Sequence, residues 1–221
     1  MGLNFKQVCE SLGPLVKEIP MSWDGKKSIL EMKDNASRNW KQMEWIGWYF
    51  EFWCQQHLCE IMEMPFSRRY GNVLFDGYLE IPWDFKVHTK ESGDIVIIND
   101  SEAISNAIND YGYVGLILVI GSATYDNTSG DFKKWHDELK GGKSNYEIKR
   151  IKRGASSRKR KINMNISQIL FVKIDDKLLA KRGSFQKNMR NSNGNPRREK
   201  VSLDLTKISD NIEYVIKNNG L

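Results

Sequence analysis

Asp76, Asp84 and Lys86 are the residues whose types and spacing best fit a chemical task. Asp84, Phe85 and Lys86 form an acid–apolar–lysine triplet, and Asp76 precedes it with seven residues between the two aspartates. Carboxylates accept hydrogen bonds but donate none, so gathering them costs several kcal/mol, roughly, unless a cation joins them. Two carboxylates that share Mg²⁺, with a lysine beside an attacking water, are the minimal apparatus for metal-assisted phosphodiester hydrolysis.

Two strand-like stretches would position these residues. The apolar stretch Val73–Phe75 runs into Asp76 and Gly77, which predicts a strand that ends on a carboxylate where the chain turns. The next stretch has the period-2 pattern of a half-buried strand, and its alternating members are Trp83, Asp84, Phe85, Lys86, Val87 and His88. That alternation puts its polar side chains on one face. If the two strands pair, Asp76 comes close to that face.

A long apolar helix is predicted before this pair, from Ser37 to about Glu63. It is apolar almost all round, which is typical of a buried helix. Glu44 and Glu51 lie seven residues apart on one side of it, and a buried carboxylate is costly unless it is paired or near a metal. Two explanations remain open: a functional role, or ion pairs with basic residues such as Lys41, Arg68 and Arg69.

An acid, any residue and a lysine also occur in that order at six other places in the chain, so the triplet alone carries little weight. The copy at Asp84 differs because it lies on an alternating strand, follows Asp76, and comes after the helix that carries Glu51. This arrangement resembles the PD-(D/E)XK nuclease superfamily, to which many type II restriction endonucleases belong. The residues that carry the resemblance are Gly47–Glu51, Phe75–Gly77 and Asp84–Lys86.

The resemblance covers residues 37 to 123, the expected catalytic core. It implies an α/β (α+β) fold with a central mixed β-sheet flanked by helices, as in a restriction endonuclease-like core. Asp76 and Asp84 would bind Mg²⁺, Lys86 would orient or activate the water, and Glu51 would support the metal or its waters. The chain departs from the family pattern in having Phe75 where that pattern has proline.

Positive charge is concentrated in two segments. Residues 143 to 161 carry a net charge of +8 and residues 181 to 200 carry +6, so the rest of the chain sums to −8. This is the expected footprint of a polyanion such as double-stranded DNA. The candidate DNA-binding residues are Arg158, Lys159, Arg160, Lys161, Gln186, Lys187, Asn188, Arg190, Asn191, Asn193, Arg197 and Arg198. Amides can pair with adenine and arginine with guanine, although solvated loops and ordinary turns would explain the same composition.

The 221 residues favour one domain over two small ones, and a hydrophobic content of 40% indicates a folded protein. The longest apolar run, Val114–Ile120, is too short to cross a bilayer, and the N-terminus lacks a signal-peptide core, so a cytoplasmic location is expected. Cys54 and Cys59 are expected in the core. Further elements are predicted as strands over 113–123, 166–174 and 201–205, and helices over 101–110, 131–140 and 208–217, the first capped by Asn99 or Ser101.

The favoured function is a Mg²⁺-dependent type II restriction endonuclease that acts as a homodimer on a palindromic DNA site. Three alternatives stay open: a DNA-repair nickase of the same superfamily, a nucleic-acid-binding protein in which Lys86 forms a structural ion pair, and a protein whose basic segments bind an acidic partner.

Overall fold

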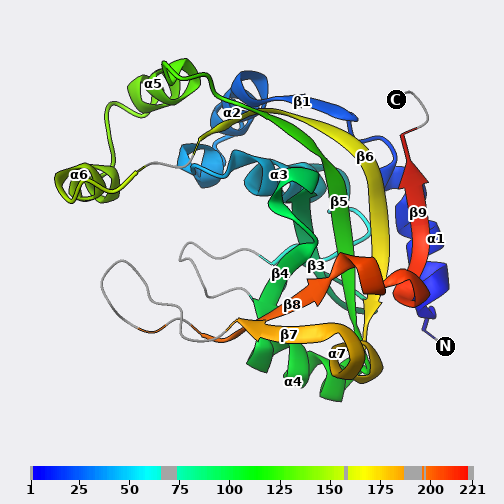
Figure 1. Ribbon diagram of the computed structural model, residues 1–221. Helices are drawn as coiled ribbons and strands as arrows, with labels where there is room; N and C mark the ends of the chain where they lie inside the picture. The colour runs from blue at the N-terminus through cyan, green and yellow to red at the C-terminus, as the bar shows by residue number, and fades with distance from the viewer. Residues whose placement is uncertain (1, 66–73, 157–158, 187–195, 197, 219–221) are drawn as a thin grey trace.

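The computed structural model of the chain describes residues 2–65, 74–156, 159–186, 196 and 198–218. A curled mixed sheet runs through it (Figure 1). The strands of this sheet, in spatial order, are β1 (Ser22–Asp24), β6 (Lys161–Ile174), β5 (Val114–Tyr125), β3 (Ile81–Thr89) and β2 (Gly77–Leu79), with β9 (Ile212–Lys217) paired to β6. A second sheet has the order β4 (Ile95–Asp100), β8 (Lys200–Asp204) and β7 (Gly183–Gln186).

Helices and the second sheet cover the two faces of the main sheet. One face packs against α1 (Phe5–Val16), α2 (Gly25–Asp34) and α3 (Trp45–His57). The other packs against α4 (Ser101–Tyr111), α7 (Asp176–Arg182) and the second sheet. The expected α/β (α+β) class, with a mixed sheet flanked by helices, is confirmed. Short 3-10 turns complete the described chain at Arg38–Lys41, Lys90–Ser92, Leu205–Lys207 and Ser209–Asn211.

The register of β3 against β5 decides which way the candidate residues point. The two strands are parallel, and Asp84 and Lys86 stand opposite Leu116 and Leu118 of β5, on the face that packs against α4. Trp83 and Phe85 therefore point to the face covered by α3. Because helices and the second sheet cover both faces of the main sheet, most residues of β3 are buried, rather than half of them as the alternating pattern predicted.

A glycine fixes this register. Gly115 stands opposite Trp83, and a Cβ atom at Gly115 would lie 2.4 Å from the Trp83 ring. Only a residue without a side chain fits beneath the indole there. At the other end of the sheet, Ser22 of β1 pairs with Asn165 of β6, 143 positions later.

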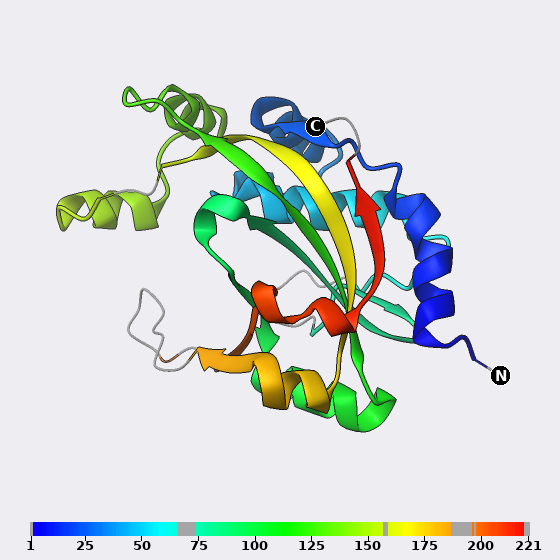
Figure 2. The ribbon, with the colours of Figure 1, turned by 45° about the vertical axis from the view of Figure 1, so that its right-hand side comes forward.

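An arm made of α5 (Asp131–Leu139) and α6 (Asn145–Lys152) projects from the end of β5 (Figures 1 and 2). Asp126 holds its base, because its buried carboxylate accepts hydrogen bonds from the backbone N–H groups of Phe132 (3.2 Å) and Lys133 (2.9 Å). Glu147 of α6 pairs with Lys133 at 3.0 Å and with Arg150 at 2.7 Å. An ionic contact thus joins the two helices of the arm.

Three expected elements differ from the structure. The apolar helix is shorter than predicted: Ser37 caps the 3-10 turn instead, and α3 spans only Trp45–His57. The strand predicted at Val73–Phe75 is absent at its described residues 74 and 75, and the pairing strand is β2, which begins after Asp76. The C-terminal helix is strand β9, because Ile212, Tyr214 and Ile216 alternate with more exposed residues. No helix among the described residues has the length and apolar character needed to cross a bilayer.

Candidate active site

Asp76 lies where the β2–β3 hairpin opens. The ladder between the strands ends at the pair Gly77–Trp83, after which the Asp76 N–H donates to the Trp83 carbonyl at 2.9 Å. The next bond of the ladder comes from a side chain, because the Phe85 N–H donates to Asp76 Oδ2 at 2.7 Å. The Asp76 carboxylate therefore takes the place of a backbone carbonyl as the hydrogen-bond acceptor at this edge of β3. The sequence predicted a strand before Asp76, whereas strand β2 follows Asp76.

Lys86 brings the candidate triad together. Its Nζ lies 2.7 Å from Asp84 Oδ2 and 3.7 Å from Asp76 Oδ2, and it donates to the Phe85 carbonyl at 3.0 Å. The Asp84 side chain is only 2% exposed, whereas those of Lys86 and Asp76 are 25% and 24% exposed. Solvent therefore reaches part of the Lys86 and Asp76 side chains, while the Asp84 carboxylate is buried.

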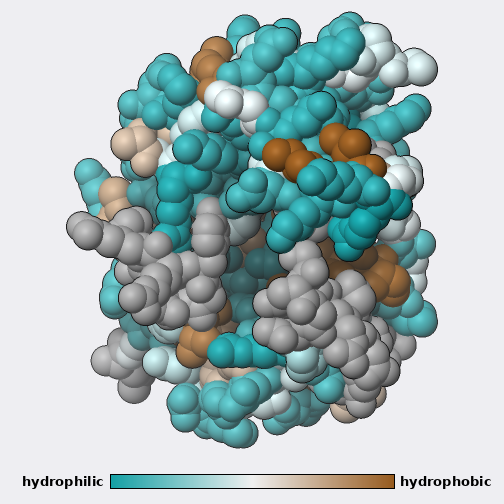
Figure 3. Space-filling view, turned by 90° about the vertical axis from the view of Figure 1, so that its left-hand side faces the viewer, coloured by the Kyte–Doolittle hydropathy of each residue, from teal (hydrophilic) through white to brown (hydrophobic). Residues whose placement is uncertain are grey.

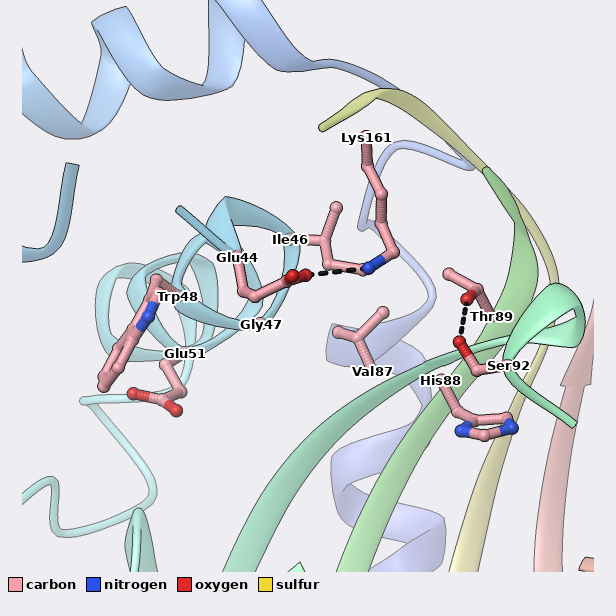
Figure 4. A pocket seen from close by; sticks show the side chains of 10 residues that line it. All are labelled: Glu44, Ile46, Gly47, Trp48, Glu51, Val87, His88, Thr89, Ser92 and Lys161. Carbon is pink, nitrogen blue, oxygen red and sulfur yellow. Dashed lines mark hydrogen bonds and ion pairs between the residues drawn. The ribbon is translucent and has the colours of Figure 1, made fainter. Parts of the chain in front are cut away.

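Glu51 on α3 interacts electrostatically with this group. Burial raises the pKa of Glu51 to about 8, and the negative charge of Asp76 adds to that shift, while Lys86 opposes it. Glu44 does not belong to the same cluster: its carboxylate pairs with Lys161 at 2.7 Å and turns to the other side of the cleft in Figure 4. Of the two helix glutamates, Glu51 is the one beside the candidate triad.

Burial and the ion-pair partner act in opposite directions on the pKa values of Asp84 and Lys86. Burial acts to lower the pKa of Lys86, but Asp84, Asp76 and Glu51 together raise it above its usual value. Burial raises the pKa of Asp84 to about 7, although the Lys86 charge acts to lower it. For this ion pair we take the ammonium as charged, because three carboxylates act on it in the same sense. The site thus holds more acidic groups than the cation neutralises, which favours an added cation.

A cleft of about 240 Å³ opens beside the cluster between α3 and the end of β3. Its walls come from α3 and from the far end of β3 and the turn after it (Figure 4). They are formed by Glu44, Ile46, Gly47, Trp48, Glu51, Val87, His88, Thr89, Ser92 and Lys161. Glu51 is the member of the candidate group that lines this cleft. Figure 3 shows one face of the molecule hollowed at its centre, with hydrophilic residues and several hydrophobic ones near the hollow.

The donor set suits a hard cation such as Mg²⁺. Within the described ranges, no three His, Cys, Asp or Glu side chains are grouped so as to hold a metal by themselves. Asp84 Oδ2, however, is buried without a hydrogen bond in the described structure, and its contact there is the ion pair with Lys86. Mg²⁺ is typically bound by one or two carboxylates and keeps several waters. Asp76, Asp84 and the Phe85 carbonyl are oxygen donors of that kind.

The structure separates the basic residues into different environments. In the first segment, Arg160 is buried at 7% exposure, Lys161 pairs with Glu44, and Lys159 is exposed. This segment is therefore not one open loop, since it includes α6 and the first residue of β6. In the second segment, Gln186 ends β7 and Arg198 pairs with Asp100 at 3.2 Å. The remaining candidates lie outside the described residues: Arg158, Lys187, Asn188, Arg190, Asn191, Asn193 and Arg197.

Asn99 is a site residue that the sequence did not reveal. It was expected as a helix cap, but Asp100 is the N-cap of α4, and Asn99 Nδ2 donates to Asp84 Oδ1 at 3.2 Å. Nothing in the local sequence distinguishes it, because its contact depends on how β4 crosses β3. The cysteines also differ from one another: Cys54 is buried, as expected, and Cys59 is exposed.

The chain matches no known family model, and no curated protein or solved structure shows significant similarity to it. The resemblance to the PD-(D/E)XK superfamily therefore stands on the residues of the site.

Proposed function

We propose that this protein is a Mg²⁺-dependent endonuclease of the type II restriction class, which hydrolyses phosphodiester bonds in double-stranded DNA. The observation that carries the proposal is the meeting of Lys86 with Asp84 and Asp76 at 2.7 and 3.7 Å, with Glu51 beside them. When bound, Mg²⁺ would neutralise charge on the reacting phosphate and favour ionisation of a bound water.

The residues of the chain have separate tasks in this proposal. Asp84 and Asp76 hold the cation, and the Phe85 carbonyl adds a backbone oxygen. Lys86, whose side chain is 25% exposed, would orient or activate the water, and the surrounding carboxylates favour its charged form. Glu51 orients water at the wall of the cleft.

DNA is the proposed partner because two segments of the chain outside the acidic cluster carry a concentrated positive charge. The segments with net charges of +8 and +6 would neutralise phosphates of the DNA backbone. The acidic site itself would need a bound cation before a phosphate could approach it. Cutting both strands at a palindrome calls for two copies related by a two-fold axis, so we propose a homodimer. A nuclease acting on DNA that enters a cell works in the cytoplasm, which is the proposed location.

Digestion of a phage genome with the purified full chain tests the proposal. We expect discrete fragments with Mg²⁺ and none with EDTA. Lys86→Met should lose at least about 100-fold in rate, the usual effect of removing a positioned acid–base or charged group. Lys90→Met is the matched control, because Lys90 is exposed on the turn that follows β3. Equal cleavage by wild type and Lys86→Met would refute the assignment.

A plasmid digest and a DNA-binding measurement test two of the alternative functions. Conversion of a supercoiled plasmid only to its nicked form would indicate a repair nickase. Salt-dependent binding of duplex DNA without cleavage, and without a response to Mg²⁺, would indicate that the Lys86–Asp84 contact is a structural ion pair in a non-catalytic DNA-binding protein.

A further inference from the structure

Asn99 connects three parts of the candidate site. Its Nδ2 donates to Asp84 Oδ1 at 3.2 Å and to the Leu74 carbonyl at 2.5 Å. Its Oδ1 accepts a hydrogen bond from the Asp100 N–H at 2.8 Å. The orientation of the amide is determined by its partners, since turning it over would set an oxygen against two acceptors and an NH₂ against a donor.

The bond to Asp84 determines how that carboxylate is presented. Asp84 is 2% exposed, so its orientation depends on protein groups rather than on water. With Oδ1 held by Asn99, Oδ2 is left on the side of Lys86. A donor at one oxygen also stabilises the negative charge that a metal ligand must carry. Asn99 therefore holds one oxygen of the buried carboxylate and leaves the other toward Lys86.

The bond to Leu74 acts on the other carboxylate. Leu74 lies two residues before Asp76, and the Phe85 N–H donates a hydrogen bond to the Asp76 side chain. The backbone just before Asp76 is therefore hydrogen-bonded to the same side-chain amide that contacts Asp84. One side chain from β4 thus contacts both Asp84 and the backbone that leads into Asp76.

We propose that Asn99 is a positioning residue for the metal-binding carboxylates, acting through Asp84 directly and through the Leu74 backbone on Asp76. This inference rests on the proposed function. Groups that orient metal ligands from behind typically contribute about 10- to 100-fold to metal affinity. Asn99 needs no contact with DNA or with the reacting phosphate for this role.

Calorimetric measurement of Ca²⁺ binding to the full chain, without DNA, tests the role independently of cleavage. Asn99→Leu removes both donated bonds at similar volume, and we expect its affinity for Ca²⁺ to fall by about tenfold or more. Asn99→Gln retains an amide donor and should recover part of the loss. Asn106→Leu is the matched control, because Asn106 is exposed on α4, and it should bind as the wild type does.

Asp84→Asn, measured in parallel, separates this inference from the proposed function. If Asp84→Asn loses Ca²⁺ binding and Asn99→Leu does not, Asn99 has no positioning role and the nuclease proposal stands. If the wild type and Asp84→Asn bind alike, or neither binds, there is no metal site on Asp84 and both proposals fail. Should Asn99→Leu not fold, the smaller Asn99→Ser takes its place, and wild-type affinity in that variant would equally overturn the inference.

A purely structural role for Asn99 predicts a different result. Such a role would lower the melting temperature of Asn99→Leu while its folded fraction kept wild-type affinity for Ca²⁺. Under the positioning role, the Mg²⁺ concentration that gives half-maximal cleavage should rise by about tenfold or more, and saturating Mg²⁺ should restore part of the rate. DNA affinity measured in Ca²⁺-free buffer should stay within about twofold of wild type, because the basic segments are untouched.

Discussion

The Asp76 carboxylate accepts a hydrogen bond from the backbone N–H of Phe85 at 2.7 Å, on the edge of β3 that β2 leaves open. The same oxygen, Oδ2, lies 3.7 Å from Lys86 Nζ. Asp76 therefore has two tasks, one in holding the hairpin and one in the charge cluster. Substitutions can separate them.

Asp76→Asn and Asp76→Ala should differ in stability but not in activity. The asparagine keeps an oxygen that can accept from Phe85 N–H, whereas alanine leaves that N–H without its partner, which costs about 1–3 kcal/mol. Both variants lose the charge, so both should lose Mg²⁺-dependent cleavage. Urea unfolding and plasmid cleavage measure the two effects. Equal stability of the variants would show that the Phe85 hydrogen bond contributes nothing to the fold.

Glu51→Gln should exchange activity for stability. Glu51 has a folded-state pKa of about 8, raised by burial, and an unfolded-state pKa near its usual 4.5. Its contribution to stability is therefore fully present below about pH 4.5 and is lost as the pH rises through 8. Without divalent metal, the wild type should lose melting temperature relative to Glu51→Gln between pH 5 and pH 9, as followed by circular dichroism. Parallel pH curves for the two proteins would contradict this.

His136 should destabilise the fold in acid. Burial lowers the pKa of His136 to about 4 from its usual value of 6.5, and its Nε2 lies 2.9 Å from the Trp40 carbonyl. Since the unfolded chain binds the proton more readily, stability present above pH 6.5 is lost as the pH falls to 4, by at most about 3 kcal/mol. In His136→Gln, the glutamine side chain can still donate a hydrogen bond but does not titrate. The slope of unfolding free energy against pH in this window should therefore be smaller in the variant.

Gly115→Ala should lower the stability of the fold next to the candidate site. The new Cβ would lie 2.4 Å from the Trp83 ring, and overpacking of this kind costs about 1–3 kcal/mol. Gly47→Ala is the matched control, because its Cβ meets no atom within 4 Å and alanine favours the helix by about 0.5–1 kcal/mol. Urea unfolding should show opposite signs for the two variants. A Gly115→Ala protein as stable as wild type would mean that Trp83 shifts freely.

The sequence predicted the part of the site that depends on local pattern. Alternation placed Asp84 and Lys86 on one face of a strand, and the order of the motifs placed Glu51 and Asp76 near them. The burial of Arg160 and the contact of Asn99 with Asp84 were not predictable, because both depend on packing between segments distant in sequence. For residues 208–217 the sequence predicts a helix, whereas Ile212–Lys217 is a strand in which Ile212, Tyr214 and Ile216 alternate with more exposed residues.

The pairing of Ser22 with Asn165 across 143 positions has a consequence for the order of folding. A ribosome releases the N-terminus first, so β1 has no neighbour in its sheet until β6 has been made, and long-range pairing of this kind is slow. One stretch of the chain holds Glu51, Asp76, Asp84 and Lys86, whereas Asn99 lies on β4, whose neighbour in the second sheet is β8 (Lys200–Asp204). The candidate site can therefore be complete only after residues 181 to 200, the second basic segment, have left the ribosome.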